Sequence, residues 1–170
     1  MAFGVLVADG STCCPVPFDV AGEVVWFHLA RANPACACLD GRAVDLLVMG
    51  PHGYVSPTRY VTGPDHVPTW NHAVVALRGP VRALPDEALP ELLQRQLARF
   101  EREWTPAAVS DRAMASMLRA ICGFEMTVDR VEGKLELSQN RDPSDHEAVC
   151  AHLDGPLAAL TRDALRRRGG

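Results

Sequence analysis

Apolar runs in the first half of the chain predict a series of β-strands. Separated by Gly, Pro and Asp, these runs cover residues 3–8, 24–30, 44–49 and 69–84. No helical run long enough for a parallel crossover lies between the early runs, so we expect an antiparallel sheet or a closed barrel. Within the last run, Gly79-Pro80 predicts a sharp bend between two faces of such a barrel.

Two amphipathic helices are predicted next, over residues 86–104 and 110–122. In the first, apolar residues recur at spacings of three and four, which gives one face suited to packing on the sheet. The second stops at Gly123, a residue suited to the position just after a helix. A last helical stretch begins at Ser144 as part of a capping box, and Gly155-Pro156 divides it in two.

The segment 123–141 combines strand alternation with a dense polar cluster. Residues 123–129 alternate between apolar and polar, Glu132-Gly133 predicts a turn, and 134–137 predicts a returning strand. Four hydrogen-bonding side chains then follow in a row: Ser138, Gln139, Asn140 and Arg141. This cluster indicates either a site for a polar ligand or subunit contact, or a solvated loop that leads into the next helix.

Length and charge limit the function classes. A chain of 170 residues with 48% hydrophobic residues fits one globular domain with its own core. Its 17 basic and 21 acidic side chains give a net charge of −4, which disfavours direct nucleic-acid binding. The N-terminal apolar run is far shorter than the roughly 20 residues of a membrane span, so we expect a cytoplasmic protein without membrane contact.

The six cysteines are irregularly spaced and unlike a secreted disulfide framework. We therefore expect reduced thiols. Cys36 and Cys38 have the spacing of half a metal site, but no second Cys or His pair stands at zinc-like spacing, so metal binding there is disfavoured.

Four motifs in register carry a resemblance to a known family. They are His28–Pro34, Gly50–Pro57, Val67–Asn71 and Val131–Arg141. Together they resemble the PaiB-type FMN-binding negative transcriptional regulators. The resemblance implies a mainly β fold with flanking helices (α+β), a split β-barrel that forms a homodimer with cofactor sites at the subunit interface. It also implies a barrel domain over 1–141, including the helical pair 86–122, with a C-terminal helical tail over 142–170.

Hydroxyl, amide and guanidinium groups in these motifs suit a phosphate-bearing cofactor such as FMN. The candidate cofactor-binding residues are His28, Arg31, Asn33, Tyr54, Ser56, Thr69, Trp70, Asn71, Ser138, Gln139, Asn140 and Arg141. Two of them have plainer interpretations. His28 alone is equally typical of a hydrogen-bonded barrel histidine, and Trp70 alone is more typical of barrel or dimer packing.

A sister branch of the same barrel, which resembles piperazate synthase, implies haem b instead of FMN. There the motif histidine looks like the axial iron ligand, a role that carries over to His28, and the substrate is an N-hydroxylated diamino acid that forms an N–N bond. Two other histidines of the regulator family are replaced here, by Pro15 and near Ala76. These replacements weaken the FMN expectation, favour His28 as the surviving ligand, and leave it open whether the protein is an enzyme, a regulator or a cofactor-free dimeric interaction module. A flavin-dependent oxidoreductase would lack a recognisable acid or base on the substrate side.

Overall fold

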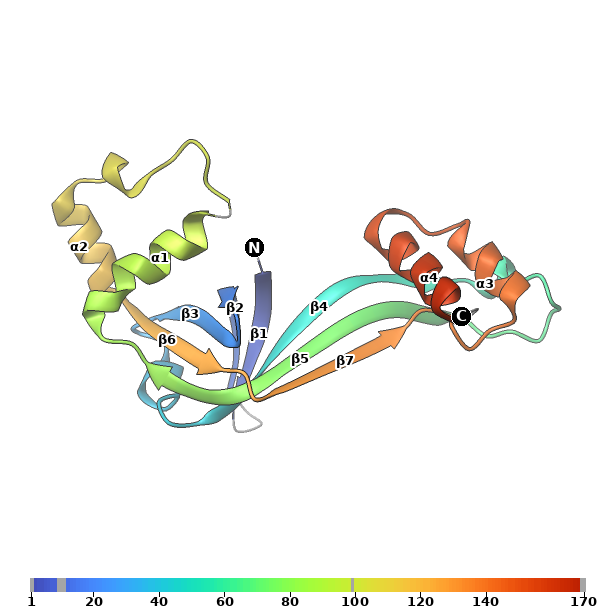
Figure 1. Ribbon diagram of the computed structural model, residues 1–170, viewed down its shortest axis with the longest axis horizontal. Helices are drawn as coiled ribbons and strands as arrows, with labels where there is room; N and C mark the ends of the chain where they lie inside the picture. Colours follow the sequence, from blue (N-terminus) through green and yellow to red (C-terminus); the bar gives the residue numbers. More distant parts are fainter. Residues whose placement is uncertain (1, 9–11, 99, 169–170) are drawn as a thin grey trace. The chain divides into compact units, whose positions relative to one another are not determined.

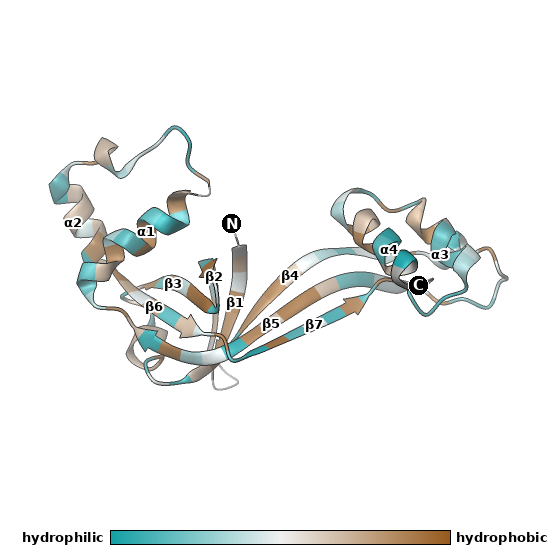
Figure 2. Cartoon of the chain, in the orientation of Figure 1, coloured by the Kyte–Doolittle hydropathy of each residue, from teal (hydrophilic) through white to brown (hydrophobic). Residues whose placement is uncertain are grey.

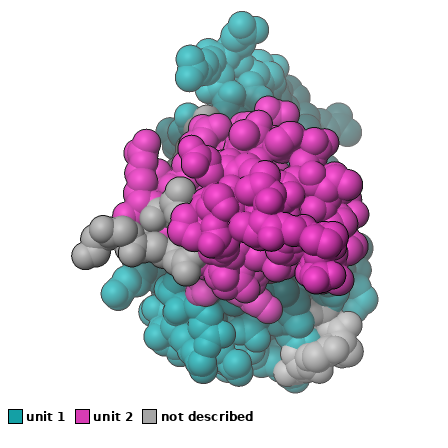
Figure 3. Space-filling model, turned by 90° about the vertical axis from the view of Figure 1, so that its right-hand side faces the viewer, with its two compact units in different colours: residues 1–48, 76–132 teal, residues 49–75, 133–170 magenta. Residues whose placement is uncertain are grey.

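The computed structural model describes residues 2–8, 12–98 and 100–168 (Figure 1). The chain forms two compact units, each built from two stretches of sequence and coloured separately in Figure 3. The first unit comprises Met1–Val48 and Ala76–Glu132, and the second comprises Met49–Val75 and Gly133–Gly170. The predicted boundary at residue 141, between a barrel domain and a helical tail, is a different division of the chain and stays a prediction.

Four antiparallel strands form most of the first unit. They are β1 (Ala2–Ala8), β2 (Thr12–Ala21), β3 (Val24–Ala30) and β6 (Ile121–Thr127). The alternation along β3 places Val25, Phe27 and Leu29 in the core, as the apolar pattern predicts. Phe27 lies opposite Phe124 of β6, and their stacked rings are 5.4 Å apart. These residues are the centre of the hydrophobic core.

Three further strands complete the sheet: β4 (Ala43–Val55), β5 (Thr69–Ala83) and β7 (Arg130–Glu136). Strand β5 matches its predicted range, β4 is longer than predicted, and β7 is paired differently from the prediction. Among the described residues the strand order is β4-β1-β2-β3-β6-β5-β7, and an additional pairing of β4 with β5 closes a ring. The antiparallel barrel expectation is therefore confirmed. Along β5, hydrophobic residues, brown in Figure 2, are interspersed with paler and hydrophilic ones.

The predicted hairpin over 123–137 is wrong. Strand β7 lies beside β5 instead of β6, and Glu132-Gly133 lies inside β7. The chain leaves β6 earlier, because the amide of Val128 donates to Glu23 O and that of Asp129 donates to Arg78 O. The alternation was read correctly as strand, but periodicity does not specify a strand's partner.

Strand β2 was missed because Pro15 and Pro17 interrupt its sequence. Both prolines lie in the part of β2 that pairs with β1, and β3 joins β2 only from Phe18 onward. With one neighbour over this stretch, the missing N–H groups of the two prolines leave no gap in a second ladder.

The first two helices are shorter than predicted. Helix α1 spans Leu89–Ala98, α2 spans Asp111–Arg119, α3 spans Pro143–Cys150 and α4 spans Gly155–Arg168. Gly123 is not a helix cap: it lies in β6, where a Cβ atom would stand 2.6 Å from Leu89 Cδ2 of α1. Helix α3 is capped by Asp142 and not by the predicted Ser144 box. The break at Gly155 is confirmed.

No helix in the described part of the chain is both long and apolar enough to cross a membrane.

Candidate functional site

In the first unit, β3 presents His28 to helix α1. The Nδ1 atom of His28 lies 2.8 Å from Gln96 Oε1. The amide nitrogen of Gln96 in turn donates to Pro17 O of β2 (3.2 Å) and Trp26 O of β3 (3.4 Å). Burial lowers the pKa of His28 below its ordinary value, and the hydrogen bond with Gln96 offsets part of this effect. The imidazole is therefore neutral at physiological pH.

Arg31 and Asn33, also predicted as cofactor ligands, fasten the loop that follows β3. The guanidinium of Arg31 donates to Asp86 Oδ1 and to Arg119 O, each at 2.9 Å. Asn33 caps the short helix η1 (Pro34–Ala37) by accepting from the amide of Ala35 at 3.0 Å. Both side chains therefore stabilise the loop through contacts within the first unit. The sequence motif does not distinguish this role from ligand binding.

Two cysteines of this loop face backbone oxygens. Cys36 Sγ donates to Ala30 O at 3.2 Å and Cys38 Sγ to Ala35 O at 3.5 Å. Burial, helped by a hydrogen bond with Cys122, raises the pKa of Cys36 to about 12. Within the described ranges, no three His, Cys, Asp or Glu side chains gather where they could hold a metal ion.

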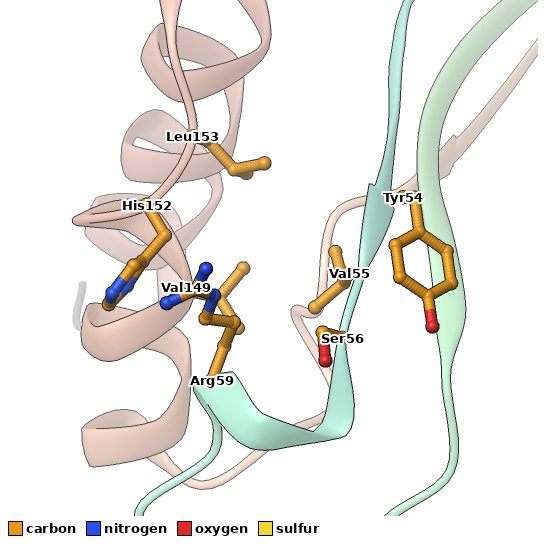
Figure 4. Close-up of a pocket in the computed structure, with 7 residues that line it drawn as sticks. All are labelled: Tyr54, Val55, Ser56, Arg59, Val149, His152 and Leu153. Atoms are coloured by element: carbon orange, nitrogen blue, oxygen red, sulfur yellow. The ribbon is translucent and has the colours of Figure 1, made fainter.

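In the second unit, a cavity of about 160 Å³ lies between the end of β4 and helix α3 (Figure 4). Its apolar lining is Val55, Val149 and Leu153, and its polar lining includes Ser56, Arg59 and His152. Ser56 caps the short helix η2 (Pro57–Arg59), and Ser56 Oγ lies 2.9 Å from Thr58 Oγ1. Arg59 and His152 are not among the candidate cofactor-binding residues given above. The sequence nevertheless points to Arg59, because its guanidinium lies in the hydroxyl-rich loop 51–60, which suits a phosphate-bearing ligand; nothing local marks His152.

Tyr54 contributes to this cavity from β4, but its ring lies on the opposite side of the strand from the other labelled side chains (Figure 4). There it meets Trp70 of β5 edge-on, with ring centroids 6.1 Å apart. His52 lies at the same distance from Trp70. Tyr54 and Trp70 remain 54% and 55% exposed. The structure thus brings two predicted residues together on an aromatic surface, and Thr69, half-buried, begins the same strand.

Asn71 and Ser138 are also brought together, but inside the second unit. Both are buried, and Ser138 Oγ donates to Asn71 Oδ1 at 3.0 Å. Ser138 has a φ of 59°, the left-handed region that a turn requires. The Nδ2 atom of Asn71 is buried and has no partner within the described residues. The hydrogen bond between Ser138 and Asn71 joins β5 to the segment that follows β7, and the amide NH₂ group of Asn71 is not used in it.

The rest of the predicted polar cluster serves the turn or lies on the surface. Gln139 Oε1 accepts from the amide of Leu137 at 2.5 Å, and Gln139 Nε2 donates to Leu135 O. The guanidinium of Arg141 lies 4.8 Å from the centre of the Tyr60 ring. Asn140 is exposed. The loop interpretation of this segment therefore accounts for Gln139, while the ligand interpretation stays a prediction.

A carboxylate that sequence reasoning missed organises the loop after η2. Asp145 is buried and accepts hydrogen bonds from the amides of Val61 (2.6 Å) and Thr62 (3.0 Å) and from Thr62 Oγ1 (2.5 Å). His66 Nε2 lies 3.6 Å from its second oxygen. Burial alone would raise the pKa of Asp145, but these hydrogen bonds together hold it below its usual value. Nothing in the sequence around Asp145 marks this long-range role.

Comparisons with known proteins agree with this architecture. Residues 1–130 match the family described as "Putative FMN-binding domain". The chain is 30% identical over 156 residues to the protease synthase and sporulation protein PAI 2 of Bacillus subtilis strain 168, covering 83% of this chain and 73% of that protein.

Two solved structures share the fold at low identity. The FAD and haem binding protein from Mycobacterium smegmatis is 20% identical, with a TM-score of 0.52 over 79% of this chain and 64% of that one. The flavocytochrome Anf3 from Azotobacter vinelandii is 15% identical, with a TM-score of 0.54 over 94% and 67%. The fold is the split β-barrel that the sequence motifs imply. Because residues 1–130 match the family model, the chain belongs to this family of FMN-binding domains.

Proposed function

We propose that this protein binds FMN through its second unit and acts as a regulator-like flavoprotein without direct contact to DNA. The observation that carries FMN binding is the family match over residues 1–130, together with the relationship to PAI 2, and the placement in the second unit rests on the side chains there. The side chains of one cavity in the second unit fit the anionic phosphate of FMN. When bound, FMN would supply one- and two-electron transfer.

The phosphate end fits the cavity of Figure 4. The Arg59 guanidinium has no hydrogen-bond or ion-pair partner among the described residues, so it is available for a bidentate contact with phosphate oxygens. The Ser56 hydroxyl is a second donor on the same wall. Neither group has to give up an ion pair to bind an anion, which favours this cavity over the Arg31 site, where the guanidinium already pairs with Asp86.

The exposed aromatic surface of Tyr54 and Trp70 lies on the opposite side of β4 from this cavity, so it does not belong to the same FMN site. A partner packed on this surface would cover apolar area that is otherwise in contact with water. The second unit also exposes further large apolar side chains: Met49, Val61, Val67, Val75 and Leu135. We propose that a second copy of the chain covers part of this surface, giving the homodimer expected from the family resemblance.

Replacing Arg59 with Gln tests the phosphate contact. FMN titrated into cofactor-free protein should bind about tenfold to a hundredfold more weakly to R59Q, because a charged hydrogen bond contributes roughly 1.5–3 kcal/mol. Riboflavin, which lacks the phosphate, should bind both proteins equally. Arg112→Gln, an exposed arginine of α2, is the matched control.

Three outcomes are distinguishable. Weaker FMN binding with unchanged riboflavin binding supports the cavity as the phosphate site. Equal loss of both ligands, or no loss of either, contradicts that assignment. If the wild-type protein binds neither flavin and shows no absorbance bands near about 370 and 450 nm when purified, the flavin proposal itself fails.

A second candidate function, a haem-dependent biosynthetic enzyme of the piperazate-synthase type, is favoured by one observation at His28. Its imidazole is neutral, and its Nε2 atom has no hydrogen-bond partner among the described residues. A neutral imidazole with one free nitrogen fits a single axial haem ligand. Bound haem would supply a Lewis-acidic iron, and an amino-acid-derived hydroxylamine would be the substrate class.

The absorbance of the haemin-titrated protein decides this candidate. A Soret band near about 400 nm that is lost in His28→Ala and kept in His72→Ala supports the axial assignment. A Soret band that His28→Ala leaves unchanged would sink it.

A further inference from the structure

Gln96 of helix α1 hydrogen-bonds both to His28 and to the backbone of two barrel strands. Its Oε1 atom lies 2.8 Å from His28 Nδ1, and its Nε2 atom donates to the carbonyl oxygens of Pro17 and Trp26. Strands β2 and β3 and helix α1 therefore meet at this amide.

The two carbonyl contacts fix which way the amide faces. Carbonyl oxygens only accept hydrogen bonds, so the NH₂ group of Gln96 must be the end that faces Pro17 and Trp26. Oxygen Oε1 then faces His28, and an amide oxygen also only accepts. The Nδ1 atom of His28 must therefore carry the proton of this hydrogen bond.

The helix that carries Gln96 is held firmly on the barrel. Leu89 and Leu92 of α1 are 1% and 0% exposed. Beside Gln96, the guanidinium of Arg95 lies 4.1 Å from the centre of the Trp26 ring, and its Nε lies 3.6 Å from Asp19 Oδ2. A side chain on a packed helix keeps its position better than one on a loop.

A neutral imidazole with its proton on Nδ1 has its lone pair on Nε2. That atom makes no hydrogen bond within the described residues and is not among the fully buried polar atoms. The hydrogen bond at Nδ1 is also the arrangement that orients histidines which bind metals through the other nitrogen.

We propose that Gln96 is a positioning residue that holds His28 as the Nδ1–H tautomer, so that Nε2 stands ready as a lone-pair donor to a bound metal centre. The tautomer rests on the hydrogen bonds alone. The identity of the metal centre as haem iron rests on the second candidate function above.

Nitrogen-15 NMR of histidine-labelled protein, in a neutral buffer and without cofactor, tests the tautomer directly. In the wild type, His28 should show a protonated Nδ1 and an unprotonated Nε2, with the signals assigned by their loss in His28→Ala. Gln96→Leu should shift the proton toward Nε2, the nitrogen that free neutral histidine prefers. Gln94→Leu makes the same change at an exposed position of the same helix and should leave His28 unaltered.

The proposal is overturned if wild-type His28 carries its proton on Nε2, or if Gln96→Leu leaves the tautomer unchanged. Gln96→Met, whose thioether is only a weak acceptor, gives the same test should the leucine variant fail to fold. Haemin titration is the second readout: loss of the supporting hydrogen bond should weaken binding by about tenfold to a hundredfold in Gln96→Leu but not in Gln94→Leu. Wild-type protein that shows the tautomer but binds no haemin would refute the haem candidate and leave the role of Gln96 intact.

Discussion

Asn71 and Ser138 lie 67 positions apart, and both belong to motifs that the sequence marks as candidate cofactor sites. In the fold they hydrogen-bond to each other in the interior of the second unit. Side-chain chemistry identifies such residues as potential donors and acceptors, but it does not tell whether the partner is a ligand or another part of the chain. Arg31 and Asn33 illustrate the same limit, because both are occupied by contacts within the first unit.

Asp145 gives the second unit a pH-dependent stability. Its folded-state pKa lies below that of an unfolded Asp, about 3.9. A depressed pKa contributes stability that is present above the unfolded value and is lost as the pH falls through the folded value. Asp145→Asn should therefore be less stable than wild type in urea titrations at pH 7, and this difference should shrink in acid below about pH 4.

Asp65→Asn, an exposed position in the same loop, is the control and should match the wild type throughout. A stability difference for Asp145→Asn that stays constant down to pH 3 would contradict the role of the ionised carboxylate.

At the scale of strands, the close approach of β5 to the end of β6 depends on Gly79. A Cβ atom at this position would stand 1.7 Å from Thr127 O. Gly79 and Pro80 lie within the continuous strand β5, and the bend that the sequence marks there stays a prediction.

Gly79→Ala should destabilise the protein by about 1–3 kcal/mol, because the added methyl group must push two strands apart. Gly133 of β7 offers a matched control, since a Cβ there meets nothing within 4 Å. Gly133→Ala should change the unfolding free energy by less than about 0.5 kcal/mol. Equal effects of both substitutions in denaturant titrations would show that the loss of stability comes from backbone propensity and not from the close approach of Gly79 to Thr127.

The element pattern was predictable where a strand or helix is amphipathic and uninterrupted, as in β3 and the apolar face of α1. The sequence pattern predicts the wrong element where the choice between strand, helix and loop depends on distant neighbours. Pro15 and Pro17 hid β2, and Gly123 was assigned to a helix end although it makes room for Leu89 on β6.

At the scale of the whole molecule, the proposed homodimer predicts how surface charge affects association. Light scattering should give the wild type twice the chain mass of 18.4 kDa. Trp70→Glu, which puts a charge on the exposed aromatic surface, should raise the dimer dissociation constant at least about tenfold. Met117→Glu, at a similarly exposed apolar residue of α2, should not.

A wild-type protein that stays monomeric at all concentrations would contradict the homodimer. The net charge of −4 also predicts that the purified protein does not retard promoter DNA at physiological salt, and retardation there would refute the proposal of regulation without DNA contact.

The sequence by itself determined the family, the antiparallel barrel class and the chemistry-bearing motifs, because these follow from local composition, periodicity and motif order. Tertiary structure decided which of those residues are free to bind. It occupied Arg31, Asn33 and Gln139 with internal contacts, and among the residues that the structure describes it left the Arg59 guanidinium and His28 Nε2 without partners. Hydrogen-bond partners are set by long-range packing, which no local pattern records; Gln96 beside His28, 68 positions away, is the clearest case.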